Sequence, residues 1–243
     1  MTDLIDIHCH VLPRVDDGAR NTEQSLEMLS LMRREGIRSA ILTPHYHGGY
    51  METGSEKLKD RFGKLCAAAQ QDDRTKDMSL YLGCEIYYYP SVVDWLDEGY
   101  VLSMAGSRYV LLEFGFTSDV RTIKEGISNV VNSGYVPIIA HLERYKKLVG
   151  DIKSVDELIS KGAYIQINSE ALTDGFKVRS FAKKLLKERM VHFLATDAHD
   201  TKRRAPKLSK AVSYIEKHYG GSYCRELVID NPERVINNEY ISG

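Results

Sequence analysis

The sequence predicts an α/β protein in which seven strands alternate with helices and close into a barrel. Three observations lead to this fold class. Short apolar runs alternate with amphipathic helical stretches along the 243 residues. Most of these runs end in His, Asp or Glu, as expected for a barrel whose active site lies at the C-terminal ends of its strands. No Gly-x-Gly-x-x-Gly or Walker A sequence is present, so an open sheet with a nucleotide-cradling loop is disfavoured.

The strand predictions rest on apolar, often β-branched runs. Gly36, Gly134 and Gly162 each separate such a run from the helix before it, because glycine readily takes the left-handed conformation that ends a helix. The expected strands are residues 4–10, 37–43, 80–86, 109–114, 135–140, 163–167 and 191–195.

The helix predictions rest on capping residues and apolar faces. Asn21 can cap the first helix, and Gln24 stands at its third position. Leu26, Leu29 and Met32 then recur on one face. Further helices are expected from Ser55 to Ala69, from Pro90 to Leu96, over 120–131, from Ser154 to Gly162, over 181–187, over 208–215 and over 230–236.

The composition bounds the domain organisation and the class of partner. A length of 243 residues without a Pro, Gly or Ser-rich linker indicates one domain over residues 1–243. The formal net charge is −1 with both signs mixed along the chain, so a nucleic-acid partner is not expected. The N-terminus lacks a signal region, and no apolar run approaches the roughly 20 residues of a membrane span. We therefore expect a soluble, cytoplasmic protein without membrane insertion.

The stretch Asp6–His10 places two histidines at the end of the first predicted strand. Residues two apart in a strand point to one face, so His8 and His10 can bind one ion. A His-x-His pair is weak evidence alone, but other strand-like runs also end in ligand-type residues. These ends are Thr43–His45, Gly83–Glu85, Leu112–Glu113, Ala140–His141 and Thr196–His199. A polynuclear metal site explains this repetition.

Imidazole and carboxylate donors without thiolate suit Mn, Fe or Zn. Such metals lower the pKa of a bridging water, so that a metal-bound hydroxide can attack, and they neutralise phosphoryl oxygens. A site of this kind can hydrolyse a phosphomonoester without a covalent enzyme intermediate. The four cysteines are not arranged for thiol chemistry: Cys9 to Arg14 encloses four residues, whereas cysteine-based tyrosine phosphatases need five.

Three further residues are candidates for catalysis. Arg144 and Arg204 each follow a ligand-type histidine and can clamp phosphate oxygens bidentately; the alternative is a surface salt bridge, and Arg203 can replace Arg204. His47 can protonate a leaving group, although a phenol of pKa about 10 leaves without much help. Tyrosines near these motifs either wall an aromatic cleft or pack structurally: Tyr46, Tyr50, Tyr87, Tyr88, Tyr89 and Tyr145.

The motif-bearing segments resemble the PHP (polymerase and histidinol phosphatase) superfamily along nearly the whole chain. Within it, the chain is most similar to the bacterial manganese-dependent protein-tyrosine phosphatases of capsule and exopolysaccharide operons, the CpsB/YwqE type. The phrases that carry this similarity are Val15–Gly18, Gly83–Tyr87, Leu112–Phe114, Pro137–Tyr145 and Asp230–Pro232.

The resemblance implies the PHP fold, a distorted TIM-like barrel of seven β/α units, with three metal ions, expected to be Mn. The implied ligands are His8, His10, Glu85 and Asp197 for one metal, Glu85, Glu113 and His141 for the second, and Asp17, His45 and His199 for the third. Asp17 and Glu113 stand where the histidinol-phosphatase branch has histidines. Asp16 is interpreted as a loop-capping residue, although the sequence leaves the opposite assignment of Asp16 and Asp17 open.

The implied activity is hydrolysis of phosphotyrosine on a protein, expected to be a tyrosine autokinase that regulates capsular or exopolysaccharide biosynthesis. The alternative is a PHP phosphatase for a small metabolite such as histidinol phosphate. A third hypothesis is a catalytically silent metal-binding module that docks on a kinase. Retention of all nine ligands and of both arginines disfavours this third hypothesis.

Overall fold

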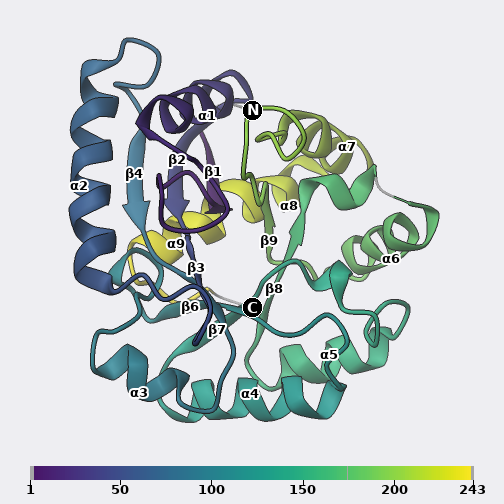
Figure 1. Ribbon diagram of the computed structural model, residues 1–243. Helices are drawn as coiled ribbons and strands as arrows, with labels where there is room; N and C mark the ends of the chain where they lie inside the picture. Colours follow the sequence, from purple (N-terminus) through teal and green to yellow (C-terminus); the bar gives the residue numbers. More distant parts are fainter. Residues whose placement is uncertain (1–2, 174, 242–243) are drawn as a thin grey trace.

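Parallel strands curl around a central axis, and helices cover the outside of the curl (Figure 1). The computed structural model describes residues 3–173 and 175–241. Its strands are β1 (Leu4–Cys9), β2 (Ile37–Leu42), β3 (His45–Tyr46), β4 (Ser79–Leu82), β5 (Glu85–Tyr87), β6 (Tyr109–Glu113), β7 (Val136–Ile139), β8 (Tyr164–Asn168) and β9 (Phe193–Ala195). They form a three-stranded sheet in the order β1-β2-β4 and a six-stranded sheet in the order β3-β5-β6-β7-β8-β9.

One predicted strand is divided and one short strand, β3, follows the strand predicted over 37–43, so the described chain has nine strands instead of seven. The strand predicted over 80–86 separates into β4, which pairs with β2, and β5, which pairs with β3. Gly83 lies at this break, where an added Cβ would lie 3.0 Å from the Met104 Cα. Pro44 similarly separates β2 from β3, since proline has no N–H to donate to a ladder.

The first and last strands meet and close the curl. The amide of Asp197 donates to the His8 carbonyl at 2.8 Å, and the amide of His10 donates to the Ala198 carbonyl at 2.8 Å. The carboxylate of Asp6, which is fully buried, accepts hydrogen bonds from the amide and the hydroxyl of Thr196. The end of β1 is therefore fixed beside the segment that follows β9.

The helices are α1 (Thr22–Arg34), α2 (Ser55–Gln71), α3 (Val92–Asp97), α4 (Val120–Asn132), α5 (Ile152–Ser160), α6 (Phe176–Lys187), α7 (Ser209–Tyr219), α8 (Gly221–Arg225) and α9 (Asn231–Ile236). Helices α1 to α6 connect successive strands on the outer face, whereas the later helices follow the last strand (Figure 1). Asn21 caps α1 as predicted, accepting from the Gln24 amide at 2.9 Å. The prediction that Ser154 caps the helix that begins near it is wrong: Asp151 caps α5, and its side chain accepts from the Ser154 amide at 3.0 Å.

The buried apolar residues form two cores, one inside the curled sheet and one between the sheet and the outer helices. The inner core includes Ile7, Leu111 and Phe193 from the strands and Val235 from α9, all of them fully buried. Figure 1 shows α9 behind the strands, where it covers one end of the ring. Burying each such side chain contributes roughly 1.5–3 kcal/mol. Polar side chains then gather at the other end, where the strands terminate.

Within the described residues, no helix combines the length and apolarity needed to cross a membrane.

Candidate metal centre

Glu85 lies at the centre of the polar cluster, between the two histidines of β1. Its Oε2 atom is 3.1 Å from Nε2 of His8 and 3.3 Å from Nε2 of His10. The two Nε2 atoms are themselves 3.3 Å apart. Oδ1 of Asp197 lies 3.6 Å from Nε2 of His8 and 3.5 Å from Nε2 of His10. The four residues predicted to hold one metal therefore lie together.

The other face of Glu85 meets His141. Nε2 of His141 is 2.7 Å from Oε1 of Glu85 and 3.5 Å from Oε1 of Glu113. Both Glu85 and His141 are buried. Glu85 therefore contacts residues predicted to hold the first metal and residues predicted to hold the second, and it would be able to serve both.

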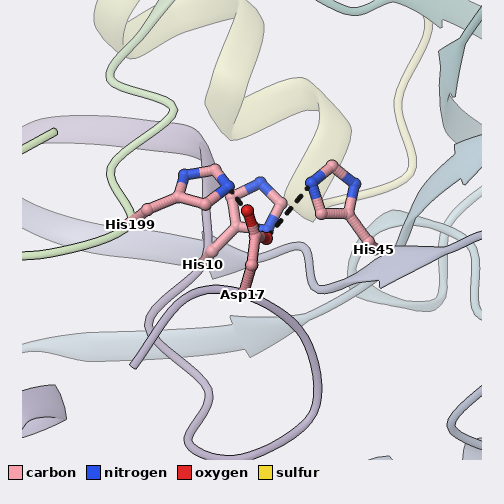
Figure 2. Close-up of side chains that lie close together, drawn as sticks. All are labelled: His10, Asp17, His45 and His199. Atoms are coloured by element: carbon pink, nitrogen blue, oxygen red, sulfur yellow. Dashed lines mark ion pairs between the residues drawn. The ribbon is translucent and has the colours of Figure 1, made fainter. Parts of the chain in front are cut away.

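A third group surrounds Asp17 (Figure 2). Oδ1 of Asp17 lies 3.4 Å from Nε2 of His199 and 3.6 Å from Nε2 of His45. The ring of His10 stacks on that of His199 at a centroid distance of 3.7 Å. Because His45 Nδ1 also lies 3.0 Å from Oε2 of Glu85, the third group is continuous with the first. The structure brings all nine predicted ligands into one cluster.

The loop after β1 directs Asp17 to the Nε2 atoms of His45 and His199. It directs Asp16 to the Nδ1 atom of His10. An added Cβ on Gly18 would lie 2.1 Å from the His10 carbonyl oxygen, so only glycine permits the loop to fold this closely against β1. Oδ2 of Asp16 accepts from Nδ1 of His10 at 2.8 Å and from the His45 amide at 3.0 Å. Asp16 therefore orients the imidazole of His10 from behind and holds the backbone of His45, as a carboxylate partner does for a metal-ligating histidine.

Two of the predicted ligands have left-handed backbone conformations. The φ angle is 32° at His141 and 52° at Asp197. Such values are uncommon for residues other than glycine, and they cluster at functional sites where the surrounding structure enforces them. Here they turn both side chains into the cluster at the points where β7 and β9 end.

Sequence reasoning missed two residues of β8 that support the cluster. Oε1 of Gln166 accepts from the His141 amide at 2.7 Å and lies 3.1 Å from Nδ1 of His8. Nδ2 of Asn168 donates to Oδ2 of Asp197 at 2.9 Å. The sequence contained a signal for these residues: Gln166 and Asn168 alternate with apolar residues at the end of the strand predicted over 163–167. Side chains two apart in a strand share one face.

The carboxylates of the cluster have opposite pKa shifts. Burial would raise the pKa of Glu85, but the neighbouring His8 and His45 lower it well below its usual value. For Glu113, burial and then the negative charge of Glu85 raise the pKa to about 7. Two carboxylates this close favour a cation between them.

The donor set fits divalent metal ions. Oε2 of Glu85 and Nε2 of His199 are buried and make no hydrogen bond within the described residues, so lone pairs remain that a cation can use. Sets of three or four donor atoms from the nine residues lie within 4.8 Å of one another. Thiolate does not compete, because burial raises the pKa of the neighbouring Cys9 thiol well above its ordinary value. Imidazole with carboxylate suits Mn, Fe or Zn.

Both predicted arginines reach the cluster through Asp197. Nη1 of Arg144 lies 3.2 Å from Oδ2 of Asp197, and Nη2 of Arg204 lies 2.9 Å from its Oδ1. Their side chains are 38% and 32% exposed, so each guanidinium faces both the cluster and the solvent. Arg203 instead is exposed and lines a separate surface cavity. Of the two neighbours, Arg204 is the one beside the cluster.

His47 lies in an aromatic group beside the cluster and not within it. Its ring stacks on Tyr87 at 4.2 Å and 10°, and Tyr50 and Tyr89 are also near. Of the two alternatives left open for the tyrosines, Tyr145 follows structural packing: it is fully buried, and its hydroxyl accepts from the Phe114 amide. The aromatic wall is therefore smaller than the tyrosine content of the sequence indicates.

A curled parallel sheet with imidazole and carboxylate donors at its strand ends is typical of metal-dependent hydrolases. The chain belongs to the family described as capsular polysaccharide synthesis, CpsB/CapC, whose model matches residues 4–237. It is 35% identical over 245 residues to the tyrosine-protein phosphatase CpsB of Streptococcus pneumoniae, covering 98% of this chain and 100% of that protein. It is 33% identical over 244 residues to the tyrosine-protein phosphatase YwqE of Bacillus subtilis, covering 98% of this chain and 93% of that protein.

A solved structure agrees with these sequence relationships. It comes from work on YwqE of Bacillus subtilis and CpsB of Streptococcus pneumoniae, described as unique metal-dependent tyrosine phosphatases. Its TM-score is 0.91 at 32% identity, covering 98% of this chain and 96% of that chain. The structures of dihydropyrimidinase and of a phosphotriesterase homology protein, at 8% and 12% identity, share the fold alone, with TM-scores of 0.58 and 0.52.

Proposed function

We propose that this protein is a metal-dependent protein-tyrosine phosphatase. The observation that carries the proposal is the cluster of five imidazoles and four carboxylates with two half-exposed arginines at its edge. We infer a barrel of seven β/α units, counting β2 with β3 and β4 with β5 as single interrupted strands. We infer three metal ions, with Mn as the first choice, held by His8, His10, Asp17, His45, Glu85, Glu113, His141, Asp197 and His199. When bound, such ions supply a nucleophilic hydroxide at neutral pH and neutralise phosphoryl oxygens.

In this proposal the arginines bind the phosphate. Arg144 and Arg204 each direct one guanidinium nitrogen to Asp197, and Nη1 of Arg204 also lies 3.9 Å from Oδ2 of Asp17. In this proposal their other N–H groups bind phosphoryl oxygens. A planar guanidinium suits this role, because two parallel N–H groups fit two oxygens of the phosphate. Asp197 sets the orientation of both arginines.

The aromatic residues at the edge favour an aryl ester. His47 and Tyr87 form a stacked pair on one side, and Phe116, whose ring lies 5.7 Å from that of His141, stands on another. An aryl ring can pack against such surfaces. Phenol, with a pKa of about 10, leaves readily, so His47 need only assist the departure.

We further propose that the substrate is a tyrosine-phosphorylated protein of capsular or exopolysaccharide biosynthesis, with a tyrosine autokinase as the expected partner. The family description and the names of the relatives support this proposal.

The test compares matched phosphotyrosine and phosphoserine peptides with histidinol phosphate, at saturating Mn and after chelation. We expect the phosphotyrosine peptide to have the highest kcat/KM, by orders of magnitude over phosphoserine, because an alkoxide leaves poorly without a positioned acid. Chelation should abolish turnover, and Cys9→Ser should retain it. Equal kcat/KM for both peptides, or a preference for histidinol phosphate, would overturn the assignment.

A further inference from the structure

A cavity of about 580 Å³ opens directly beside the candidate metal centre. It lies between the segments that follow β6, β7 and β8 and the first turn of α6. Arg144 belongs both to this cavity and to the edge of the cluster. Anything bound in the cavity is therefore adjacent to a phosphate held by Arg144. Its lining residues include Phe116, Glu143, Arg144, Lys146, Glu170 and Lys177.

The solvent-exposed charges of the cavity are mainly positive, whereas the carboxylate of Glu143 is buried. The carboxylate of Glu170 lies 3.6 Å from the Lys207 ammonium, and Arg144 is offset by Asp197. Lys146 and Lys177 are exposed, and neither appears in an ion pair among the described residues. Their two charges are therefore available to an anionic ligand.

One buried polar atom in the lining also lacks a partner. Glu143 is 3% exposed, and its Oε1 accepts from the Asn168 amide at 3.1 Å. Its Oε2 is buried without a hydrogen bond within the described residues. A buried carboxylate oxygen left in this state costs free energy. A backbone N–H of a bound peptide would satisfy it.

Phe116 separates this cavity from the aromatic group around His47. The Phe116 side chain is 40% exposed, and the guanidinium carbon of Arg144 lies 5.8 Å from its ring centroid. The adjacent Gly115 faces the other way, since an added Cβ there would lie 2.9 Å from the Tyr87 hydroxyl. The cavity and the aromatic group therefore lie on different sides of this loop.

We propose that this cavity binds the peptide segment on one side of the phosphotyrosine and selects acidic side chains there. The inference rests on the proposed phosphatase function and names the substrate feature that the enzyme reads. Lys146 and Lys177 supply the charge complementarity, Glu143 receives a peptide N–H, and Arg144 joins the cavity to the phosphate. Such a site gives specificity through electrostatic complementarity at its edge.

The test uses phosphotyrosine peptides with a neutral flank, with acidic residues only N-terminal to the phosphotyrosine, or with acidic residues only C-terminal to it. For each enzyme, the kcat/KM of each peptide is divided by that of a small aryl phosphate. We expect one acidic arrangement, and not the other, to be preferred by about fivefold, the size expected for two partly exposed ion pairs. Added salt should reduce this preference, because exposed charges are screened.

The charge-reversed variant Lys146→Glu/Lys177→Glu should lose the preference, and the neutral variant Lys146→Met/Lys177→Met should lose most of it. Lys187→Glu is the matched control, because Lys187 is an exposed lysine at the other end of α6; it should keep the preference and the activity. Metal content reports whether each variant is correctly folded.

A one-sided preference that disappears in both double variants supports the inference. The absence of a one-sided preference in the wild-type enzyme, or its survival in the charge-reversed variant, overturns the inference while leaving the phosphatase function intact. Failure to hydrolyse any of these aryl phosphates would instead overturn the proposed function itself.

Discussion

Asp197 combines two tasks in one carboxylate. Its Oδ1 lies 3.5 Å from Nε2 of His10 and 2.9 Å from Nη2 of Arg204, while Oδ2 accepts from Asn168 and lies 3.2 Å from Nη1 of Arg144. The residue thus faces the donor cluster on one side and both arginines on the other. Its left-handed backbone, with φ 52°, is what allows this arrangement at the end of β9.

The arginines should therefore affect rate more than metal binding. We expect Arg144→Ala to retain its metal and to lose roughly 30- to 1,000-fold in kcat/KM, since one charged contact in the transition state is worth about 2–4 kcal/mol. Arg203→Ala is the control, because Arg203 is exposed and should leave kcat/KM unchanged. Metal analysis measures the metal content of each variant, and steady-state kinetics on an aryl phosphate measure its kcat/KM. Near-normal activity of Arg144→Ala would assign this arginine to a structural ion pair.

At the scale of elements, β8 supports the centre without supplying a ligand. Gln166 contacts both the His141 amide and His8 Nδ1, and its Nε2 donates to Asn168 at 2.9 Å. Through these bonds one strand fixes residues at the ends of β1, β7 and β9. Partners of this kind set the ring orientation of ligating histidines, and their loss typically costs 10- to 100-fold in metal affinity.

Gln166→Ala should accordingly weaken metal binding by about 10- to 100-fold while the protein remains folded. Competition with a metal-binding dye measures the affinity, and circular dichroism confirms the fold. Gln70→Ala, at an exposed position of α2, should show wild-type affinity. An unchanged metal affinity in Gln166→Ala would mean that β7 and β1 position their histidines without help from β8.

The sequence predicted the alternation of strands and helices because periodicity and caps are local signals. The nine donor residues were identified through the family resemblance, and the structure brings them together. The breaks at Pro44 and Gly83 were not predicted, because they depend on which strands become neighbours. The burial of Tyr145 likewise depends on its contact with the Phe114 amide, far away in sequence. Long-range contacts of this kind leave no periodic pattern in one sequence.

At the scale of the whole molecule, a histidine outside the centre should make folding sensitive to acid. His192 precedes β9, and its Nδ1 accepts from the Ile165 amide at 3.1 Å. Burial lowers its pKa from 6.5 to about 4. The unfolded chain therefore takes up this proton at higher pH than the folded chain. The contribution of neutral His192 to the free energy of unfolding is fully present above pH 6.5 and is lost as the pH falls toward about 4.

The prediction is a smaller acid sensitivity in His192→Gln. Between pH 7 and pH 5, the wild type should lose about 2 kcal/mol more of its free energy of unfolding than the variant loses. Urea titrations of both proteins in the presence of a chelator measure this difference, and the shared background of metal-site protonation cancels. Parallel stability curves for the two proteins would contradict the assigned role of His192.

The contact between β1 and the segment after β9 also has a consequence for biosynthesis. His8 and His10 leave the ribosome well before Asp197 and Ala198, to which their backbones are hydrogen-bonded in the folded protein. At a synthesis rate of about 5–20 residues per second, Asp197 is made on the order of 10 to 40 s after His8. The nascent chain can assemble its outer helix–strand pairs during this interval, but it acquires the complete donor set only once the last strand emerges. We therefore expect full metal loading only after this segment has been translated.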